Sequence, residues 1–416
     1  MLTQIVKSLP SSGWLLLLLS MGLFISQGHG ASSSDPAPHA AKRTGTRHCP
    51  CKDAGLCQPV QKTARKEVYG FAVKNDSATY MKYDWDKLTT LAMWEFNDEL
   101  MCFAHEKGVR LDLVASDFPV EKLTDPAFRK EWIAKKLAIV QNNFLDGLNF
   151  DPEYPIALNS PERVGLIDLV KETRTAFSAA VPGSKISFDV AWSPACVDRR
   201  CYDYEALAEV CDFLFVMSYD IQGQVWGPSC IAMSNTPFLR MVDGVRGYLS
   251  LNIPAEKLIL GLPWYGYDYP CVKISENDVC DIPRAEFHGA PCSDLVGQQK
   301  QLDEILDILK NQSTDGRKWT VDGEAPRFNY KHANGTMHQV HYDDPQSLLL
   351  RYLWAVSNDL HGVGFWHVGC LGDMETPEKS AVRTQMWKQI PDTNNWDTYL
   401  KNNQLPNEKH WPKWEM

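Results

Sequence analysis

Eight short apolar runs, most of them followed by a helical stretch, dominate the sequence between residues 68 and 368. Each run is rich in leucine, β-branched or aromatic residues and has the length of a buried strand. The runs begin at Val68, Thr90, Val109, Phe144, Lys185, Phe213, Leu258 and Gly362. The pattern between them predicts helices at 127–142, 162–180, 204–210, 237–249 and 345–358, and a last one at 376–389. Eight β/α units in succession predict an α/β fold, and specifically a closed parallel (β/α)8 TIM barrel rather than an open sheet.

One interval, residues 270–340, is too long for a simple crossover between the seventh and eighth strands. It contains three cysteines, a helical stretch near 298–311, and the strand-like runs K-W-T-V and R-F-N-Y. We therefore expect a small α+β insertion at this point. The barrel then consists of residues 66–269 and 341–392, followed by a C-terminal tail at 393–416.

The N-terminus carries an apolar stretch from Trp14 to Ile25, preceded by Lys7 and followed by small and polar residues. This pattern predicts a cleaved secretory signal peptide at 1–30, with an uncleaved anchor as the alternative. The following residues, 31–65, form a cysteine-containing N-terminal segment. Since no later stretch approaches the ~20 apolar residues of a membrane-spanning helix, we expect no association with a membrane.

All 12 cysteines follow the signal peptide, which predicts disulfides whose pairing the sequence leaves open. The C-P-C-K…C run could also be a metal knuckle, but no histidine pair completes a zinc site, so we expect no metal. N-glycosylation sequons at Asn75, Asn311 and Asn334 fit a protein of the secretory pathway.

Charge and length narrow the choice of partners. The 416 residues carry a net charge of −10 with no long basic run, so we expect no nucleic-acid partner. The pI near 5.6 and the lack of a K-D-E-L-type retention signal allow either location in the secretory route, and we expect the lysosome, with secretion as the alternative. We expect a monomer.

The run from Phe144 to Glu153, F-L-D-G-L-N-F-D-P-E, combines a strand pattern with acidic residues. Asn149, Asp151 and Glu153 lie two residues apart and therefore share one face of a strand. Repulsion between the carboxyls should raise at least one pKa, which lets a carboxylic acid stay protonated for general-acid catalysis. A solvated acidic turn is the alternative, but the apolar frame and Pro152 favour the end of a buried strand.

The same run resembles the D-G-x-D-x-D-x-E signature of glycoside hydrolase family 18, the chitinase-like enzymes. Asp146, Gly147, Asp151 and Glu153 match it, and Asn149 stands where the family usually has aspartate. M-S-Y-D at 217–220 and G-L-P-W-Y-G at 261–266 resemble the family's M-x-Y-D and G-x-P-x-Y-G. Segments at 340–347 and 362–366 extend the resemblance to about residue 367.

The resemblance implies a retaining glycosidase without a cofactor, in which the substrate's own 2-acetamido group attacks the anomeric carbon. Glu153 would protonate the departing oxygen and later activate water. Asp151 would hold the acetamido group and balance the developing charge, and Tyr219 would donate to the acetamido oxygen. Expected supporting residues are Asp146, Asn149 and Asp220, and expected sugar contacts are Trp366, Trp264 and Tyr265.

The implied substrate is an oligosaccharide with β-1,4-linked N-acetylglucosamine, above all the chitobiose core of asparagine-linked glycans. A non-catalytic chitinase-like lectin is the main alternative, and the presence of Glu153 favours the enzyme. A third class, a metal-dependent hydrolase with Asp146, Asp151 and Glu153 as ligands, lacks paired histidines at the strand ends. Because Asn149 cannot share a proton with Asp151, we expect Asp151 to ionise more easily than it would beside an aspartate.

Overall fold

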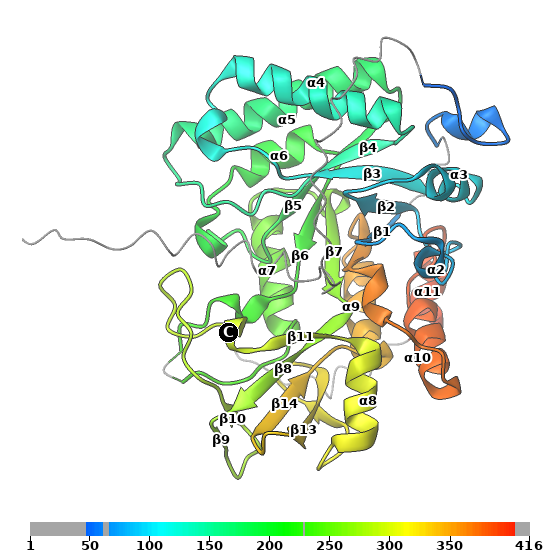
Figure 1. Ribbon diagram of the computed structural model, residues 1–416. Coiled ribbons are helices and arrows are strands. Elements are labelled where there is room, and N and C mark those ends of the chain that lie inside the picture. The colour runs from blue at the N-terminus through cyan, green and yellow to red at the C-terminus, as the bar shows by residue number, and fades with distance from the viewer. Residues whose placement is uncertain (1–46, 61–65, 228, 404–416) are drawn as a thin grey trace, which may run out of the picture. The chain divides into compact units, whose positions relative to one another are not determined.

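A computed structural model of the protein describes residues 47–60, 66–227 and 229–403 (Figure 1). The predicted signal peptide at 1–30 lies outside these residues, and the N-terminal segment and the C-terminal tail are described only in part. Of the helices within the described ranges, none is both long and apolar enough to cross a membrane.

The predicted TIM barrel is confirmed, because eight parallel strands close on themselves in their order along the chain (Figure 1). Each of the predicted apolar runs supplies one of these strands, and the last strand pairs with the first. The strands are β1 (Glu67–Phe71), β2 (Thr90–Met93), β3 (Arg110–Ala115), β4 (Gly147–Phe150), β5 (Lys185–Val190), β6 (Phe213–Met217), β7 (Leu258–Pro263) and β15 (Gly362–Trp366).

Helices alternate with these strands and pack an apolar core against their outer faces. They are α2 (Ser77–Tyr80), α3 (Asp98–Glu106), α4 (Pro126–Asn142), α5 (Pro161–Ala180), α6 (Tyr204–Val210), α7 (Phe238–Ser250), α9 (Pro345–Ser357), α10 (Pro377–Lys388) and α11 (Trp396–Asn402). Four of the longer helices, α4, α5, α9 and α10, begin with proline, whose missing N–H costs no hydrogen bond at that position. The sequence pattern missed α2, α3 and α11, which are short.

The inside of the barrel is apolar on one side and polar on the other. Aromatic side chains from β1 and β6, among them Phe71 and Phe215, form the apolar side. A Cβ added to Gly261 or Gly364 would lie 2.3 Å or 2.6 Å from the Phe215 ring, so glycine at both positions makes room for it. The polar side consists of buried residues on β3, β4 and β5, namely Asp112, Asn149, Ser187 and Asp189. The Tyr69 hydroxyl lies 3.4 Å from both Asp112 Oδ2 and Ser187 Oγ and so joins the two sides.

The buried Asp112 carboxyl predicts that stability depends on pH. Burial, more than its charged neighbours, raises the pKa of Asp112 from 3.8 to about 7. The folded state therefore binds this proton more tightly than the unfolded state between about pH 4 and pH 7, so stability should fall as pH rises through that window. At ~1.4 kcal/mol per pKa unit, the change is on the order of a few kcal/mol.

We expect Asp112→Asn to reduce this pH dependence. The unfolding midpoint of the wild type should drop more between pH 5 and pH 8 than that of the variant. A residual slope of the same sign remains from other buried carboxyls with raised pKa values, which are described below: Asp151, Asp189, Asp220 and Asp294. An equal drop in both proteins would contradict the assignment of the slope to Asp112.

The predicted α+β insertion between β7 and β15 is confirmed, but its sheet begins at Tyr265, earlier than residue 270. An antiparallel sheet has the order β11, β8, β14, β13, β12, and a helix, α8 (Leu302–Gln312), follows its strand β11 (Figure 1). Its strands are β8 (Tyr265–Cys271), β11 (Gln298–Gln301), β12 (Lys318–Thr320), β13 (Ala325–Lys331) and β14 (Met337–His341).

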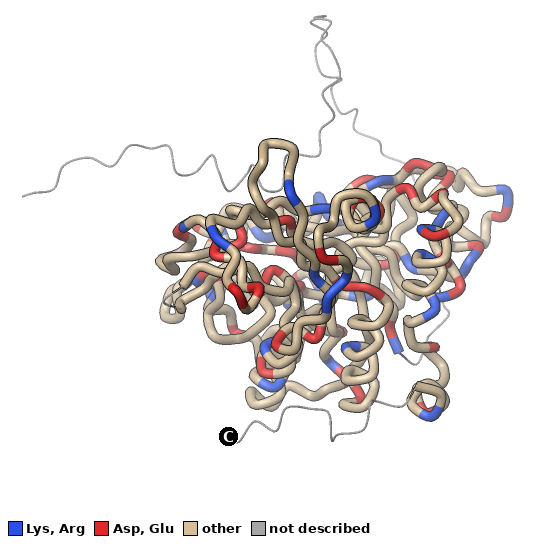
Figure 2. The backbone as a smooth tube through the Cα atoms, turned by 90° about the horizontal axis from the view of Figure 1, so that it is seen from below, with Lys and Arg blue, Asp and Glu red and all other residues tan. Residues whose placement is uncertain are grey.

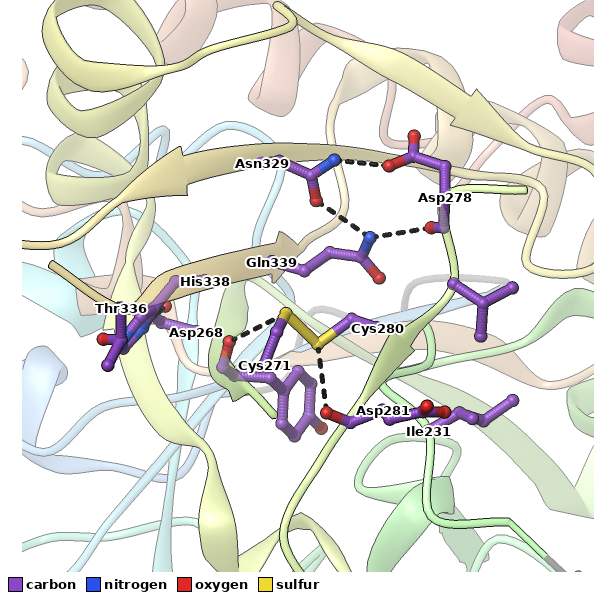
Figure 3. Close-up of a disulfide and its surroundings, with 12 residues drawn as sticks. Ile231, Asp268, Cys271, Asp278, Cys280, Asp281, Asn329, Thr336, His338 and Gln339 are labelled. Atoms are coloured by element: carbon purple, nitrogen blue, oxygen red, sulfur yellow. Dashed lines mark hydrogen bonds and ion pairs between the residues drawn. A yellow bond between two sulfur atoms is a disulfide. The ribbon is translucent and has the colours of Figure 1, made fainter. Parts of the chain in front are cut away.

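A small hairpin consists of β9 (Lys273–Ile274) and β10 (Cys280–Asp281), and the turn between these strands is hydrogen-bonded to the sheet (Figure 3). The Cys271–Cys280 disulfide closes the hairpin. Asn329 Nδ2 donates to Asp278 Oδ1 at 2.5 Å, and Gln339 Nε2 donates to the Asp278 carbonyl at 3.1 Å. The disulfide and these side-chain hydrogen bonds therefore hold the hairpin against the sheet.

The predicted disulfides are confirmed. They are Cys49–Cys57, Cys51–Cys102, Cys196–Cys201, Cys230–Cys292 and Cys271–Cys280, while Cys211 and Cys370 are buried free thiols. The metal-knuckle alternative for the C-P-C-K…C run is wrong, since its three sulfurs are all engaged in disulfides and supply no thiolate.

Asp146 binds the N-terminal segment at the amino end of β4, and this corrects its expected role as support for the site. Its carboxylate accepts from Val60 N at 2.7 Å and from Leu111 N at 2.7 Å, and lies 3.0 Å from His105 Nε2. Because the side chain is fully buried at the opposite end of the strand from Asp151, its role is structural.

Charged residues of both signs are interspersed along the described chain, and Lys and Arg do not gather in one stretch (Figure 2). The expectation that nucleic acid is not a partner stays a prediction.

Candidate active site

Asp151 and Glu153 follow β4 at its carboxyl end, where TIM barrels carry their active sites. The Asp151 N–H donates to the Ala115 carbonyl on β3 at 3.1 Å, so the pairing of the strands continues to this residue. The Tyr202 hydroxyl lies 2.8 Å from the Pro152 carbonyl oxygen and 2.7 Å from the Tyr154 carbonyl oxygen, so its single O–H is shared between the backbone on either side of Glu153.

The two carboxyls differ in exposure. Asp151 is 6% exposed, whereas the Glu153 side chain is 40% exposed and accessible to a ligand. Burial raises the pKa of Asp151 well above its ordinary value, with further increases from Glu153 and Asp189 and a decrease from Arg200. Repulsion between the two carboxyls, predicted from their spacing, thus acts on Asp151.

Arg200 pairs with Glu153, a contact that the sequence did not reveal. Its Nη1 lies 3.0 Å from Glu153 Oε2, and its Nη2 lies 2.8 Å from Asp198 Oδ2. Arg200 belongs to the loop after β5 that the Cys196–Cys201 disulfide closes. The two closely spaced cysteines were the only signal in the sequence for a constrained loop here.

Asp189 supplies an acidic group beside the position where family relatives usually have aspartate. Asn149 Nδ2 donates to Asp189 Oδ1 at 2.8 Å and to Ser187 Oγ at 3.0 Å. Asp189 is 2% exposed, and burial raises its pKa well above the ordinary value. Asp189 also raises the pKa of Asp151. The expectation that Asp151 ionises more easily beside Asn149 than beside an aspartate stays a prediction.

Tyr219 and Asp220 follow β6, also at the carboxyl ends of the strands. Burial raises the pKa of Tyr219, and the carboxylates of Asp189, Glu153 and Asp151 raise it further. The Tyr219 ring lies 6.4 Å from that of Tyr265, and the contact of its hydroxyl with a substrate stays a prediction. Asp220 has a left-handed backbone with φ 51°, and its amide donates to Asn235 Oδ1 at 2.6 Å.

Residues of the insertion also lie at this end of the barrel, where two of its tyrosines contact Asp220. Asp220 Oδ1 accepts from the Tyr265 hydroxyl at 2.5 Å and from the Tyr267 hydroxyl at 3.0 Å. The Tyr267 hydroxyl also lies 3.2 Å from Asp294 Oδ2. Burial, the largest cause in each case, raises the pKa of Asp220 to about 6 and that of Asp294 to about 8. Asp294 was missed because it lies outside the eight β/α units.

Two tryptophans meet at the carboxyl ends of β2 and β15. Trp366 is half-buried on Phe71, and its ring meets that of Trp94 perpendicularly, at a centroid distance of 5.8 Å. Trp94, which is 37% exposed, was not predicted. The pair offers an aromatic surface at the same end of the barrel as Glu153.

Two of the expected sugar contacts are buried. Trp264 is fully buried and stacks on Phe365 with a centroid distance of 4.0 Å, so its expected contact with sugar is wrong. It follows the last strand residue of β7 and points into the core between the barrel and α10, where Trp387 packs against it. Tyr265 is 3% exposed, and its hydroxyl is engaged by Asp220, so it supports Asp220 instead of offering a sugar-binding surface.

Comparison with known proteins places these residues in a family. Mouse di-N-acetylchitobiase is 41% identical over 346 residues, 83% of this chain and 93% of that protein. The human protein of the same name is 42% identical over 343 residues, 82% of this chain and 88% of that protein. The structure of a class V chitinase from Nicotiana tobaccum superposes with a TM-score of 0.61 at 20% identity, over 77% of this chain and 99% of the other, which shows a shared fold. Residues 61–370 match the family model described as glycosyl hydrolases family 18, and the chain belongs to this family.

Proposed function

We propose that the protein is a retaining glycosidase that hydrolyses β-1,4-linked N-acetylglucosamine with the help of the substrate's acetamido group. The proposed substrate is the chitobiose core of asparagine-linked oligosaccharides, during glycoprotein degradation. Family membership and identity to di-N-acetylchitobiases support the proposal. The observation that carries it is the accessible Glu153 carboxyl beside the buried Asp151 at the end of β4.

Glu153 acts in both steps of the proposed reaction. In the first step it gives its proton to the glycosidic oxygen as the bond from that oxygen to C1 breaks and the acetamido oxygen bonds to C1. In the second step the Glu153 carboxylate takes a proton from water, whose oxygen bonds to C1 while the acetamido oxygen leaves. The anomeric configuration is retained, because C1 is attacked twice.

Asp151 and Tyr219 position the acetamido group. The Asp151 carboxylate accepts its N–H and balances the positive charge that develops on the oxazolinium ring. The Tyr219 hydroxyl donates to the acetamido oxygen and aims it at C1. Asn149 lies on β4, two residues before Asp151, and is hydrogen-bonded to Ser187 and Asp189; we assign it a supporting role for Asp151. Asp220 supports the loop that carries Tyr219, because its amide is hydrogen-bonded to Asn235.

Trp366 and Trp94 form the proposed platform for the apolar face of a sugar ring. Their perpendicular contact leaves part of each ring free for stacking, and Trp366 rests on Phe71 inside the barrel. Trp264 has no part in this platform because it is fully buried.

The proposed location is the lysosome, with secretion as the alternative, and the proposed form is a glycosylated monomer. Asn311 and Asn334 are exposed and Asn75 is partly exposed, so all three sequons are accessible for glycosylation.

Substrate assistance makes a direct prediction about acetylation. The purified protein should hydrolyse N,N′-diacetylchitobiose and leave the de-N-acetylated dimer intact, because a free amine provides no carbonyl oxygen to attack C1. Quantitative chromatography of the released monosaccharide, with an early NMR spectrum for its anomer, measures both points. Equal rates on the two dimers, or release of the inverted anomer, would contradict the mechanism.

The same assay separates the alternatives. Binding of diacetylchitobiose without hydrolysis is the result expected of a lectin. Loss of activity in EDTA would favour a metal-dependent hydrolase, whereas the proposed mechanism predicts full activity in the chelator.

A further inference from the structure

Arg200 is a buried cation shared by two carboxylates, one of which is the proposed acid. Its side chain is 7% exposed, and its nitrogens contact Glu153 Oε2 at 3.0 Å and Asp198 Oδ2 at 2.8 Å. A guanidinium group has donors but no acceptor, and it stays charged at any pH at which proteins fold. It can therefore pair with the ionised form of Glu153 and has nothing to offer the proton of the neutral form.

The loop that presents Arg200 is held in place at several points. The Cys196–Cys201 disulfide closes it, and Asp198 and Arg199 have left-handed backbones with φ 53° and 62°. The Arg200 carbonyl accepts from the Tyr204 hydroxyl at 2.6 Å.

This loop also pairs with the chain that follows Glu153. Ile156 N donates to the Arg199 carbonyl at 3.0 Å, and Cys201 N donates to the Ile156 carbonyl at 3.1 Å. Arg200 and Glu153 are thus carried by two backbone segments that are hydrogen-bonded to each other, which fixes the distance between them.

We infer that Arg200 is a positioning residue that receives the Glu153 carboxylate each time the acid has given up its proton. The inference rests on the proposed function, in which Glu153 alternates between acid and base. Pairing with Arg200 stabilises the carboxylate produced by proton donation and so favours departure of the first sugar. It then holds the same carboxylate in one orientation while water approaches C1.

The second ion pair offers a matched control. Asp198 Oδ2 accepts from the other terminal nitrogen of the same guanidinium, from within the loop, and Asp198 has no place in the proposed chemistry. A role that only stabilises the loop predicts similar effects for loss of either pair. A role in positioning Glu153 predicts that loss of Arg200 lowers turnover much more than loss of Asp198.

The experiment compares wild type, Arg200→Gln, Arg200→Lys and Asp198→Asn in hydrolysis of N,N′-diacetylchitobiose. We expect Arg200→Gln to lower kcat about 10- to 100-fold, less than the loss expected when the acid or base itself is removed, with KM changed less than about threefold. Arg200→Lys keeps a positive charge and should recover part of kcat. Asp198→Asn should lower kcat less than about threefold, because the asparagine oxygen can still accept a hydrogen bond from the guanidinium. The unfolding midpoint of each variant checks that it is folded, and the lysine variant carries the test if the glutamine variant is not.

The outcomes are distinguishable. Wild type that fails to hydrolyse diacetylchitobiose overturns the proposed function itself. An active wild type with unchanged kcat in the folded Arg200 variants overturns only the role of Arg200. So does a rise in KM alone, or an equal loss of kcat in Asp198→Asn, because either result assigns the ion pairs to substrate binding or to loop structure.

Discussion

Glu153→Gln is expected to lower kcat for N,N′-diacetylchitobiose about a thousandfold, with little change in KM. Glutamine has the shape of glutamate, but it has no proton to give to the glycosidic oxygen and no carboxylate to activate water. Because the Glu153 side chain is 40% exposed, the change should cost little stability. Steady-state kinetics and the unfolding midpoint of the purified variant measure the two effects separately.

Glu106→Gln is a suitable control for this variant. Glu106 is an exposed glutamate at the end of α3, just before β3, and so lies toward the amino ends of the strands. It should hydrolyse diacetylchitobiose like the wild type. If Glu153→Gln kept more than about a tenth of wild-type kcat while folded, another residue would have to be the acid.

Asp151→Asn should have the second-largest effect, a loss of kcat of about a hundredfold or more. The amide can still contact the acetamido group, but it cannot balance the charge of an oxazolinium ring. Asp151 is 6% exposed, and burial raises its pKa, so it also contributes to the pH dependence of the wild type. If the reaction needs its ionised form, activity should fall as pH drops through this raised pKa.

Asp189→Asn tests this explanation without touching Asp151. Asparagine can keep the hydrogen bond from Asn149 Nδ2 while removing a charge that raises the pKa of Asp151. The acid limb of the kcat/KM profile should therefore move to lower pH. A profile that stays in place would show that Asp189 does not act on Asp151 during catalysis.

Much of the fold could be predicted from local patterns. Each barrel strand comes from an apolar run whose period and length are visible in the sequence, and prolines mark the beginnings of α4, α5, α9 and α10. The position of Asp151 and Glu153 after a buried strand could also be predicted from a local pattern. Residues that are two apart along a strand point to the same face, so the two carboxyls were expected to lie side by side.

The tertiary structure alone decided which residues surround these two carboxyls. Asp189 reaches Asn149 from the next strand, and Arg200 reaches Glu153 from a loop 47 residues further along. At the same end of the barrel, Tyr265 of the insertion donates to Asp220. The tertiary structure also separated Trp264, buried in the core, from Trp366 at the mouth of the barrel. The barrel and the positions of the two carboxyls could be predicted from the amino-acid sequence, because the patterns that indicate them are periodic and local. The neighbours of those carboxyls depend on strand register and on how loops close, and such contacts between distant segments have no period in the sequence.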